Sequence, residues 1–383
     1  MDSFEKLLQN LLLKRQEAGL LRQLEQYHSL IDFCSNDYLG FARSHELHDA
    51  VLRKMVALSP PATGSTGSRL ISGNSLLAEA LETRIATFHK ASSGLLFNSG
   101  YDLNLGFFSC VPQKGDTVLY DQWIHASIRD GLRLGVARHF SFRHNDLNHL
   151  KEKLRQASGQ VFIAVESVYS MDGDFAPLTE LTSLCKETGA MLIVDEAHGT
   201  GVFGPQGRGR VVELGLESQI FARIHTFGKA MGCHGAILLG PEILKNYLIN
   251  HARSLIYSTS LPAHSLISIQ CAYDFLEQHP EMLEALHERI RFFRSQLRSG
   301  SAISFLESYS PIQGALIPGN EKARQTALFL QKSGFAVKAI LSPTVPAGTE
   351  RLRICLHVHN QQEQIMRLLE ALHHYQSISQ GTS

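Results

Sequence analysis

Lys229 lies in the string TFGKAMG (226–232), directly after an apolar segment of strand length. Two glycines, Gly228 and Gly232, let the backbone come close to a ligand there. A lysine buried at the end of a strand has a lowered pKa, and its neutral amine can form a Schiff base with an aldehyde. An isolated lysine is usually a solvated surface residue. The chemistry therefore depends on which other groups converge on Lys229.

Asp195 ends the apolar run MLIVD (191–195), so the sequence predicts a carboxylate at the end of a buried strand. An unpaired carboxylate is costly to bury, and a protonated pyridine nitrogen would pair with it well. His198, three residues further on, is placed to donate to a phenolic oxygen of the same ring. The alternative is that Asp195 only caps a helix.

Ser99, Gly100 and Tyr101 follow another predicted strand and open a helix-like segment. The amides of a helix N-terminus bind phosphate well, although an ordinary strand-to-helix turn has the same pattern. His125, in DQWIHAS (121–127), is a candidate to stack on an aromatic ring, or else a capping or core histidine. Pyridoxal 5′-phosphate (PLP) needs an amine, a carboxylate, a phosphate site and a flat group. Together these segments predict a PLP site.

The elements that carry these residues alternate between short apolar runs and longer amphipathic ones. Strands are predicted at 94–98, 117–120, 161–165, 191–195, 220–226 and 236–239, with helices between some of them, such as 147–156 and 178–188. This alternation is typical of βαβ units, and it predicts the α/β class with a mostly parallel central sheet. Ligands bind such sheets at the carboxyl ends of the strands, which is where Asp195 and Lys229 fall.

The pattern changes after about residue 245, where a second lobe is expected. One long helix is predicted over 263–300, then a strand at 351–357 and a closing helix at 362–375. The N-terminus has apolar residues at the spacing of an amphipathic helix: Phe4, Leu7, Leu8, Leu11 and Leu12. We therefore predict an N-terminal helix and arm (1–45), a large PLP-binding α/β domain (46–250), and a linker helix with a smaller C-terminal α+β domain (251–383).

Composition narrows the function classes. The 383 residues include 36 basic and 36 acidic ones, so net charge favours neither nucleic acid nor an anionic membrane as a partner. Six scattered cysteines without a C-x-x-C pair indicate a reducing cytoplasm rather than a disulfide framework or a zinc site. Histidine is abundant, at 19 residues, but groupings such as His357/His359 lack a third ligand at a recognised spacing. No metal is predicted.

Nine strings along the chain resemble the α-oxoamine synthase family of fold-type I PLP-dependent transferases. They are SNDYLG (35–40), GSTGSRLISGN (64–74), NSGYDLN (98–104), DQWIHAS (121–127), SVYSMDGD (167–174), VDEAHGTGVFG (194–204), HTFGKAMG (225–232), YSTSLP (257–262) and SPTVPAGTERLRICL (342–356). One such string would be a weak signal, whereas nine in order along most of the chain are specific.

The resemblance implies a role for each candidate residue. Lys229 would be the Schiff-base lysine and the general base, Asp195 the partner of the pyridine nitrogen, and His125 a catalytic residue that stacks on the ring. The residues that would hold the cofactor are Gly100, Tyr101, His125, Ser170, Asp195, His198, Thr226 and Lys229. Those at the substrate would be Arg22, Asn36, Thr344 and Arg353. A guanidinium fork such as that of Arg353 suits the carboxylate of an amino acid.

Within the family, the chain length and the string PTVPAGT (343–349) favour members that condense L-alanine with a pimeloyl thioester in biotin biosynthesis. The thiol carrier, coenzyme A or acyl-carrier protein, stays open. Glycine C-acetyltransferase, 5-aminolevulinate synthase and serine palmitoyltransferase share the cofactor residues and are the alternatives. A non-catalytic binding subunit of the same fold is the remote one.

Two positions depart from the family pattern and put recognition of the acyl chain in question. Leu341 stands where many members have an arginine, and Ala78 where a histidine is often seen. Neither position belongs to the cofactor set. The family also implies a homodimer with shared active sites, because YSTSLP (257–262) resembles a segment that reaches the phosphate in the other protomer.

Overall fold

The computed structural model describes residues 3–27, 29–297 and 303–380. Its helices are α1 (Ser3–Glu17), η1 (Phe41–Arg43), α2 (His45–Val56), α3 (Leu76–Phe88), α4 (Gly100–Cys110), α5 (Ala126–Leu134), α6 (Leu147–Gln156), α7 (Leu178–Thr188), η2 (Pro205–Gly207), α8 (Arg210–Glu213), α9 (Glu242–His251), α10 (Arg253–Ile256), α11 (Ala263–Gln278), α12 (Glu281–Ser295), α13 (Asn320–Lys332) and α14 (Gln362–Gln380). Its strands are β1 (Ile31–Asp32), β2 (Ser93–Phe97), β3 (Thr117–Asp121), β4 (Arg138–Phe142), β5 (Val161–Glu166), β6 (Met191–Asp195), β7 (Ala222–Thr226), β8 (Ala236–Gly240), β9 (Ile312–Leu316), β10 (Phe335–Ala336), β11 (Lys338–Ile340) and β12 (Arg351–Cys355).

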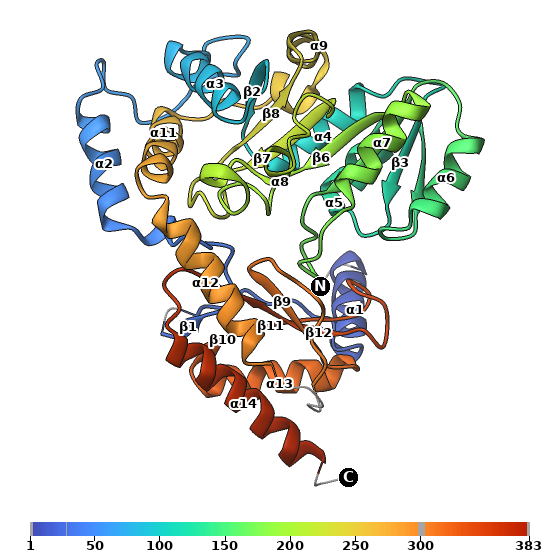
Figure 1. The fold of residues 1–383 in the computed structure, drawn as a ribbon, viewed down its shortest axis with the longest axis vertical. Coiled ribbons are helices and arrows are strands. Elements are labelled where there is room, and N and C mark those ends of the chain that lie inside the picture. The colour runs from blue at the N-terminus through green and yellow to red at the C-terminus, as the bar shows by residue number, and fades with distance from the viewer. Residues whose placement is uncertain (1–2, 28, 298–302, 381–383) are drawn as a thin grey trace.

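A seven-stranded sheet with the order β2-β8-β7-β6-β5-β3-β4 forms the centre of the larger lobe (Figure 1). β4, β3, β5, β6 and β7 are parallel, and β8 is antiparallel to both of its neighbours. The predicted mostly parallel sheet is confirmed. The edge strand β4 was not predicted, because most of its side chains are exposed or partly exposed and it contains no apolar run.

Helices cover both faces of this sheet, as the two sets of side chains on β5 show. Phe162 and Ala164 belong to a core shared with α4, α5 and α9, while Ile163 and Val165 belong to a core shared with α6 and α7. Successive side chains of a strand point to opposite faces, so a strand covered on both faces is apolar throughout. This is why the runs that became β5 and β6 could be identified in the sequence.

The smaller lobe contains a three-stranded antiparallel sheet with the order β11-β12-β9 (lower part of Figure 1). β1 pairs in parallel with β10, so the N-terminal arm is joined to the C-terminal part of the chain. The predicted single helix over 263–300 is wrong. α11 ends at Gln278 and α12 begins at Glu281, because Pro280 has no N–H to continue the hydrogen-bond ladder.

The domain boundaries near residues 45 and 250 stay predictions. Helix α11, which follows the boundary near residue 250, packs against α2 and α3, which precede it. α1 forms where a helix was expected, but none of its residues is buried. Its apolar side chains are half exposed, for example Phe4 at 60% and Leu12 at 54%. Among the described residues, no helix combines the length and the apolar character needed to cross a membrane.

Candidate active site

A cavity of about 240 Å³ lies where the neighbouring strands β5, β6 and β7 end. It is lined by Asn36, Ser99, Gly100, Tyr101, Asn104, His125, Ser127, Glu166, Asp195, Ala197, Thr226, Gly228, Lys229, His234 and Gly235. Glu166, Asp195 and Thr226 are the last residues of their strands, and Glu166 and Asp195 face each other in register. The carboxyl ends of adjacent parallel strands lie at the same edge of the sheet, so the side chains that end these strands lie close together.

Lys229 lies three residues beyond β7 and is half-buried at the cavity. Burial lowers the pKa of its amine to about 8, while the carboxylates of Asp195 and Glu166 raise it and Arg353 lowers it. A larger fraction of the amine is therefore neutral near neutral pH than for an ordinary lysine. The neutral amine is the form that reacts with an aldehyde or accepts a proton.

Asp195 is buried, with 5% of its surface exposed, and both carboxylate oxygens are engaged. Oδ1 accepts from the backbone N–H of Ala197 at 2.9 Å, and Oδ2 accepts from Nδ2 of Asn104 at 3.1 Å. The same Asn104 amide donates to Oγ of Ser127 at 3.0 Å. Asn104 was not among the predicted site residues, although it ends the NSGYDLN string (98–104). It connects the Asp195 carboxylate to Ser127 in the first turn of α5, the helix that His125 caps.

His125 lines the cavity, whereas His198 is not among the lining residues, so its contact with the cofactor stays a prediction. His125 caps α5, since its Nδ1 accepts from the Ser127 N–H at 3.2 Å, and its outer face is exposed at the cavity. It is thus both a capping residue and a candidate for the ring face. Nδ1 of the buried His198 lies 2.8 Å from the hydroxyl of Tyr38. Burial lowers the pKa of both imidazoles, that of His198 strongly, so His198 is neutral.

Gly100 and Thr226 form a narrow corner of the cavity. Gly100 is the first residue of α4, and a Cβ atom placed on it would lie 2.4 Å from Cγ2 of Thr226. Oγ1 of Thr226 is buried and has no hydrogen-bond partner in the described part of the chain. The hydroxyl of the exposed Tyr101 donates to the carboxylate of Asp130, so Tyr101 offers its backbone to the cavity corner rather than this hydroxyl. A buried hydroxyl beside a helix N-terminus is a suitable environment for a phosphate.

Arg353 comes from β12 in the smaller lobe. Its Nε donates to the carbonyl of Ser170 at 2.6 Å, and one of its terminal nitrogens donates to Oδ1 of Asn36 at 2.9 Å. Asn36 lines the cavity, whereas Arg353 and Ser170 are not among the lining residues, and Ser170 contacts Arg353 through its backbone. Their roles at the substrate and the cofactor stay predictions. Arg22 and Thr344 are both exposed and are not among the cavity-lining residues, so their substrate roles stay predictions.

Glu166 is the titratable group that the sequence interpretation passed over. It is 3% exposed, and its Oε1 is buried without a hydrogen-bond partner among the described residues. Burial and the Asp195 carboxylate raise its pKa to about 8, against the effect of the Lys229 amine. The available signal was its position as the polar residue that directly follows the predicted strand 161–165, the same signal that singled out Asp195.

Comparison with known proteins places this site in a family. A model described as "Aminotransferase class I and II" matches residues 28–372. An 8-amino-7-oxononanoate synthase from Emericella nidulans is 44% identical, over 94% of this chain and 93% of that protein. The chain belongs to the α-oxoamine synthases of the aminotransferase class I and II family.

Solved structures agree with this family. A serine palmitoyltransferase variant from S. paucimobilis, with PLP and myriocin bound, is similar with a TM-score of 0.87 at 27% identity, over 97% of this chain and 98% of that one. An 8-amino-7-oxononanoate synthase from Francisella tularensis has a TM-score of 0.78 at 28% identity, over 92% of this chain and 99% of that one. The fold is therefore that of the fold-type I PLP-dependent transferases, as predicted.

PLP is the cofactor of this α-oxoamine synthase, and the residues at the cavity fit it. The unpartnered Oγ1 of Thr226 and the α4 N-terminus offer donors to a phosphate. The Asp195 carboxylate and the Lys229 amine lie at the same cavity, so a pyridine nitrogen and an aldehyde would each find a matching group. The cavity thus contains every type of group that the cofactor requires.

Proposed function

We propose that this protein condenses L-alanine with a pimeloyl thioester, in which coenzyme A or acyl-carrier protein is the thiol carrier. The products are 8-amino-7-oxononanoate, carbon dioxide and the free thiol, in biotin biosynthesis. The high identity to 8-amino-7-oxononanoate synthases over nearly the whole chain supports these substrates. The single observation that supports the chemistry is the Lys229 amine, with its pKa lowered to about 8, facing Asp195 at one cavity.

Lys229 would carry the cofactor covalently and then act as the base. When bound, PLP supplies an electron sink for the Cα of an amino acid. The Lys229 amine would remove the Cα proton, and a pKa of about 8 suits a base that must be neutral near the working pH. Asp195 would keep the pyridine nitrogen protonated, and Asn104 fixes the orientation of that carboxylate. His125 would cover the ring face and assist at the thioester carbonyl, and His198 would contact the phenolic oxygen.

Arg353 and Asn36 would hold the carboxylate of the substrate. Two of the guanidinium nitrogens already donate to Ser170 and Asn36, which fixes the plane of the fork. A fork held in this way binds a carboxylate with a defined orientation. A fixed carboxylate in turn directs the Cα–H bond toward the base, which is the positioning part of the catalysis.

The activity is tested by incubating the PLP-loaded protein with alanine, glycine or serine against pimeloyl, acetyl, succinyl and palmitoyl thioesters, with thiol release and product mass as readouts. We expect alanine with pimeloyl-coenzyme A or pimeloyl-acyl-carrier protein to give the highest kcat/KM. Serine with palmitoyl-coenzyme A is the main competitor, because the serine palmitoyltransferase structure has the higher TM-score. A preference for serine with palmitoyl-coenzyme A would overturn the assignment. If no pair of substrates gave thiol release, the binding-subunit alternative would be favoured.

The proposal includes a homodimer with shared active sites. Apolar side chains are strongly exposed in the single chain within or beside two of the strings that carry the family resemblance, for example Ile71 at 84%, Leu76 at 86% and Tyr257 at 72%. Exposed apolar residues in this number are typical of a protein interface. Light scattering should give twice the mass of the chain. We also propose a cytoplasmic location, since all six cysteines are free thiols.

A further inference from the structure

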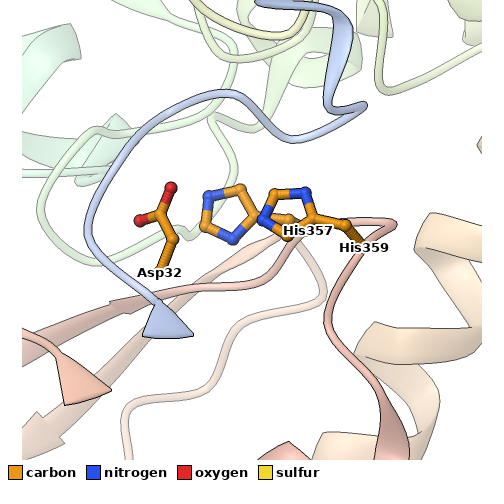
Figure 2. Close-up of side chains that lie close together, drawn as sticks. All are labelled: Asp32, His357 and His359. Atoms are coloured by element: carbon orange, nitrogen blue, oxygen red, sulfur yellow. The ribbon is translucent and has the colours of Figure 1, made fainter. Parts of the chain in front are cut away.

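Asp32, His357 and His359 lie together outside the catalytic cavity (Figure 2). Each offers one ligand atom, and these atoms all lie within 4.8 Å of one another. Asp32 ends β1, and the two histidines follow β12, so the fold brings the carboxylate to the histidine pair. We propose that these three residues bind a divalent transition-metal ion of the Zn²⁺ class, since two imidazoles and a carboxylate are a donor set that such ions accept.

His359 gives the first argument. Both of its ring nitrogens are buried, and neither has a hydrogen-bond partner in the described part of the chain. Buried polar atoms in proteins nearly always have a partner, and leaving them without one costs free energy. The ring stacks on that of His357, with centroids 4.7 Å apart and an angle of 18° between the planes. A bound cation would give His359 the partner that the protein itself does not provide.

The missing hydrogen bonds also let the site close. Ligand atoms around a tetrahedral Zn²⁺ lie roughly 3.3 Å apart, given metal–ligand bonds of about 2.0 Å. The ligand atoms here lie within 4.8 Å of one another, a limit wider than this spacing. Closure requires His359 to rotate out of its stacking with His357, since the lone pairs of two nearly parallel rings do not point to one ion. This rotation breaks no hydrogen bond of the His359 ring among the described residues.

His357 gives the second argument, through its tautomer. Oδ1 of Asn360 lies 3.0 Å from Nδ1 of His357 and also accepts from the His357 backbone N–H at 2.8 Å. Nδ2 of Asn360 donates to the carbonyl of Asp32 at 3.0 Å, which fixes the orientation of the amide. Nδ1 of His357 is therefore the protonated nitrogen of the neutral ring, and Nε2 has the lone pair. Metal-binding histidines are held by outer hydrogen bonds of this kind.

The lone pair of His357 faces other electron-rich atoms. Nε2 lies 3.1 Å from the carbonyl oxygen of Ser35 and 3.1 Å from its Oγ. The hydroxyl hydrogen of Ser35 is used by Oδ2 of Asp32, 2.7 Å away. Three atoms with lone pairs thus converge with no hydrogen between the imidazole and the carbonyl. A positive charge between these atoms, either a metal ion or a proton on Nε2, would remove the repulsion between their lone pairs.

The charged side chains around Asp32 carry a net negative charge, which favours a bound cation. Two carboxylates, Asp32 and Asp37, share the guanidinium of Arg43 at 2.6 and 3.3 Å. This leaves one negative charge uncompensated among the three groups. Backbone amides of Cys34 and Ser35 donate to Oδ1 of Asp32 and hold this carboxylate in place. The half-exposed Arg43 side chain can move outward when an ion enters.

The test is equilibrium dialysis of the PLP-loaded full chain against ZnCl₂ after treatment with EDTA, with zinc measured by elemental analysis. We expect the wild-type protein to bind one zinc ion per chain. His359→Ala and Asp32→Asn should each raise the Kd for zinc by at least about 100-fold, the upper range for loss of an outer-shell partner. The matched control is the double variant His45→Ala/His48→Ala, which removes an exposed histidine pair on α2 and should leave the affinity unchanged. PLP-free protein should bind the same amount of zinc, which excludes the cofactor as the ligand.

Two results would overturn the proposal. The first is equal zinc affinity in the wild-type protein and in His359→Ala, once thermal unfolding shows that the variant is folded. The second is zinc binding that disappears only in the α2 double variant, which would mean a surface ion. His359→Gln serves if the alanine variant does not fold. Zinc binding is measured without turnover, so failure of this proposal is distinguishable from failure of the proposed reaction.

Discussion

Two groups of residues at the catalytic cavity are built in different ways: the strand ends that line it, called here the first wall, and Arg353 with the residues that hold it, called the second wall, of which only Asn36 lines the cavity. Glu166, Asp195 and Thr226 end adjacent strands of one sheet, so their relative positions are set by hydrogen bonds within that sheet. Arg353 comes from a different sheet and is held by Ser170 and Asn36, which lie 183 and 317 positions away in the chain. The first wall is a rigid base for cofactor chemistry. The second is a junction of long-range contacts and is suited to orienting a substrate.

The largest effect is expected on the first wall, from Lys229→Ala. This change removes the covalent anchor and the base together, so kcat should fall by roughly 10⁴-fold, the upper range for a general base. Thiol release measures the rate, and the visible absorption of lysine-bound PLP should disappear. Lys114→Ala, at an exposed turn, is the control and should behave as the wild type. A visible spectrum that persists in Lys229→Ala would refute the lysine assignment.

Asp195→Asn should have the next largest effect, because it keeps the shape of the side chain and removes the charge. We expect kcat to fall by about 10²-fold, similar to the loss of one preorganised electrostatic group. Independently of turnover, the pKa of the Lys229 amine should fall below about 8, since the Asp195 carboxylate raises it. Competitive acetylation of Lys229 in PLP-free protein, followed by mass spectrometry across pH, measures this. An unchanged or higher pKa would contradict the coupling.

Arg353→Lys tests the second wall. The lysine keeps the charge but loses the fork, so KM for alanine should rise by about 30-fold, as expected for a lost hydrogen bond to a charged group. The value of kcat should also fall, because the fork directs the Cα–H bond toward the base, but by less than KM rises, since the first wall is intact. Arg291→Lys, at an exposed ion pair with Glu284, is the matched control. A fall in kcat with no change in KM would mean that the two walls do not work separately.

Glu166→Gln should have the smallest effect, and on stability rather than rate. Folding raises the pKa of Glu166 from 4.5 to about 8, so the folded protein keeps a proton that the unfolded chain loses. Between these pH values the free energy of unfolding should fall by up to about 1.4 kcal/mol per pH unit from this group. The lowered pKa of Lys229 has the opposite effect, but only between about 8 and 10.5.

Urea unfolding of PLP-free protein at several pH values between those limits measures this slope. Glu166→Gln should have a flatter pH dependence than the wild type. Glu180→Gln, at an exposed position of α7, serves as the control. Parallel curves for the wild type and Glu166→Gln would show that Glu166 is ionised in the folded protein.

Periodicity in the sequence predicted much of the first wall, whereas Arg353, Asn36 and Ser170 of the second wall were named only through the family resemblance. The strands β5 and β6 were found because both of their faces are buried, and Asp195 was found because it ends such a strand. Glu166 has the same position and could have been found by the same rule. The continuous helix over 263–300 was wrong because Pro280 falls between two helical segments and ends the first hydrogen-bond ladder. β4 was missed because an exposed edge strand lacks the apolar run of a central one.

The sequence by itself determined the mostly parallel sheet, the family and the residues at the strand ends, because apolar periodicity and short motifs are local properties of the chain. Only the tertiary structure decided which distant residues meet. It joined Arg353 to Asn36 and Ser170, and it brought Asp32 to the pair His357/His359, for which the sequence offered no third ligand. Contacts of this kind depend on the packing of two lobes and one arm, and no spacing along the chain encodes them.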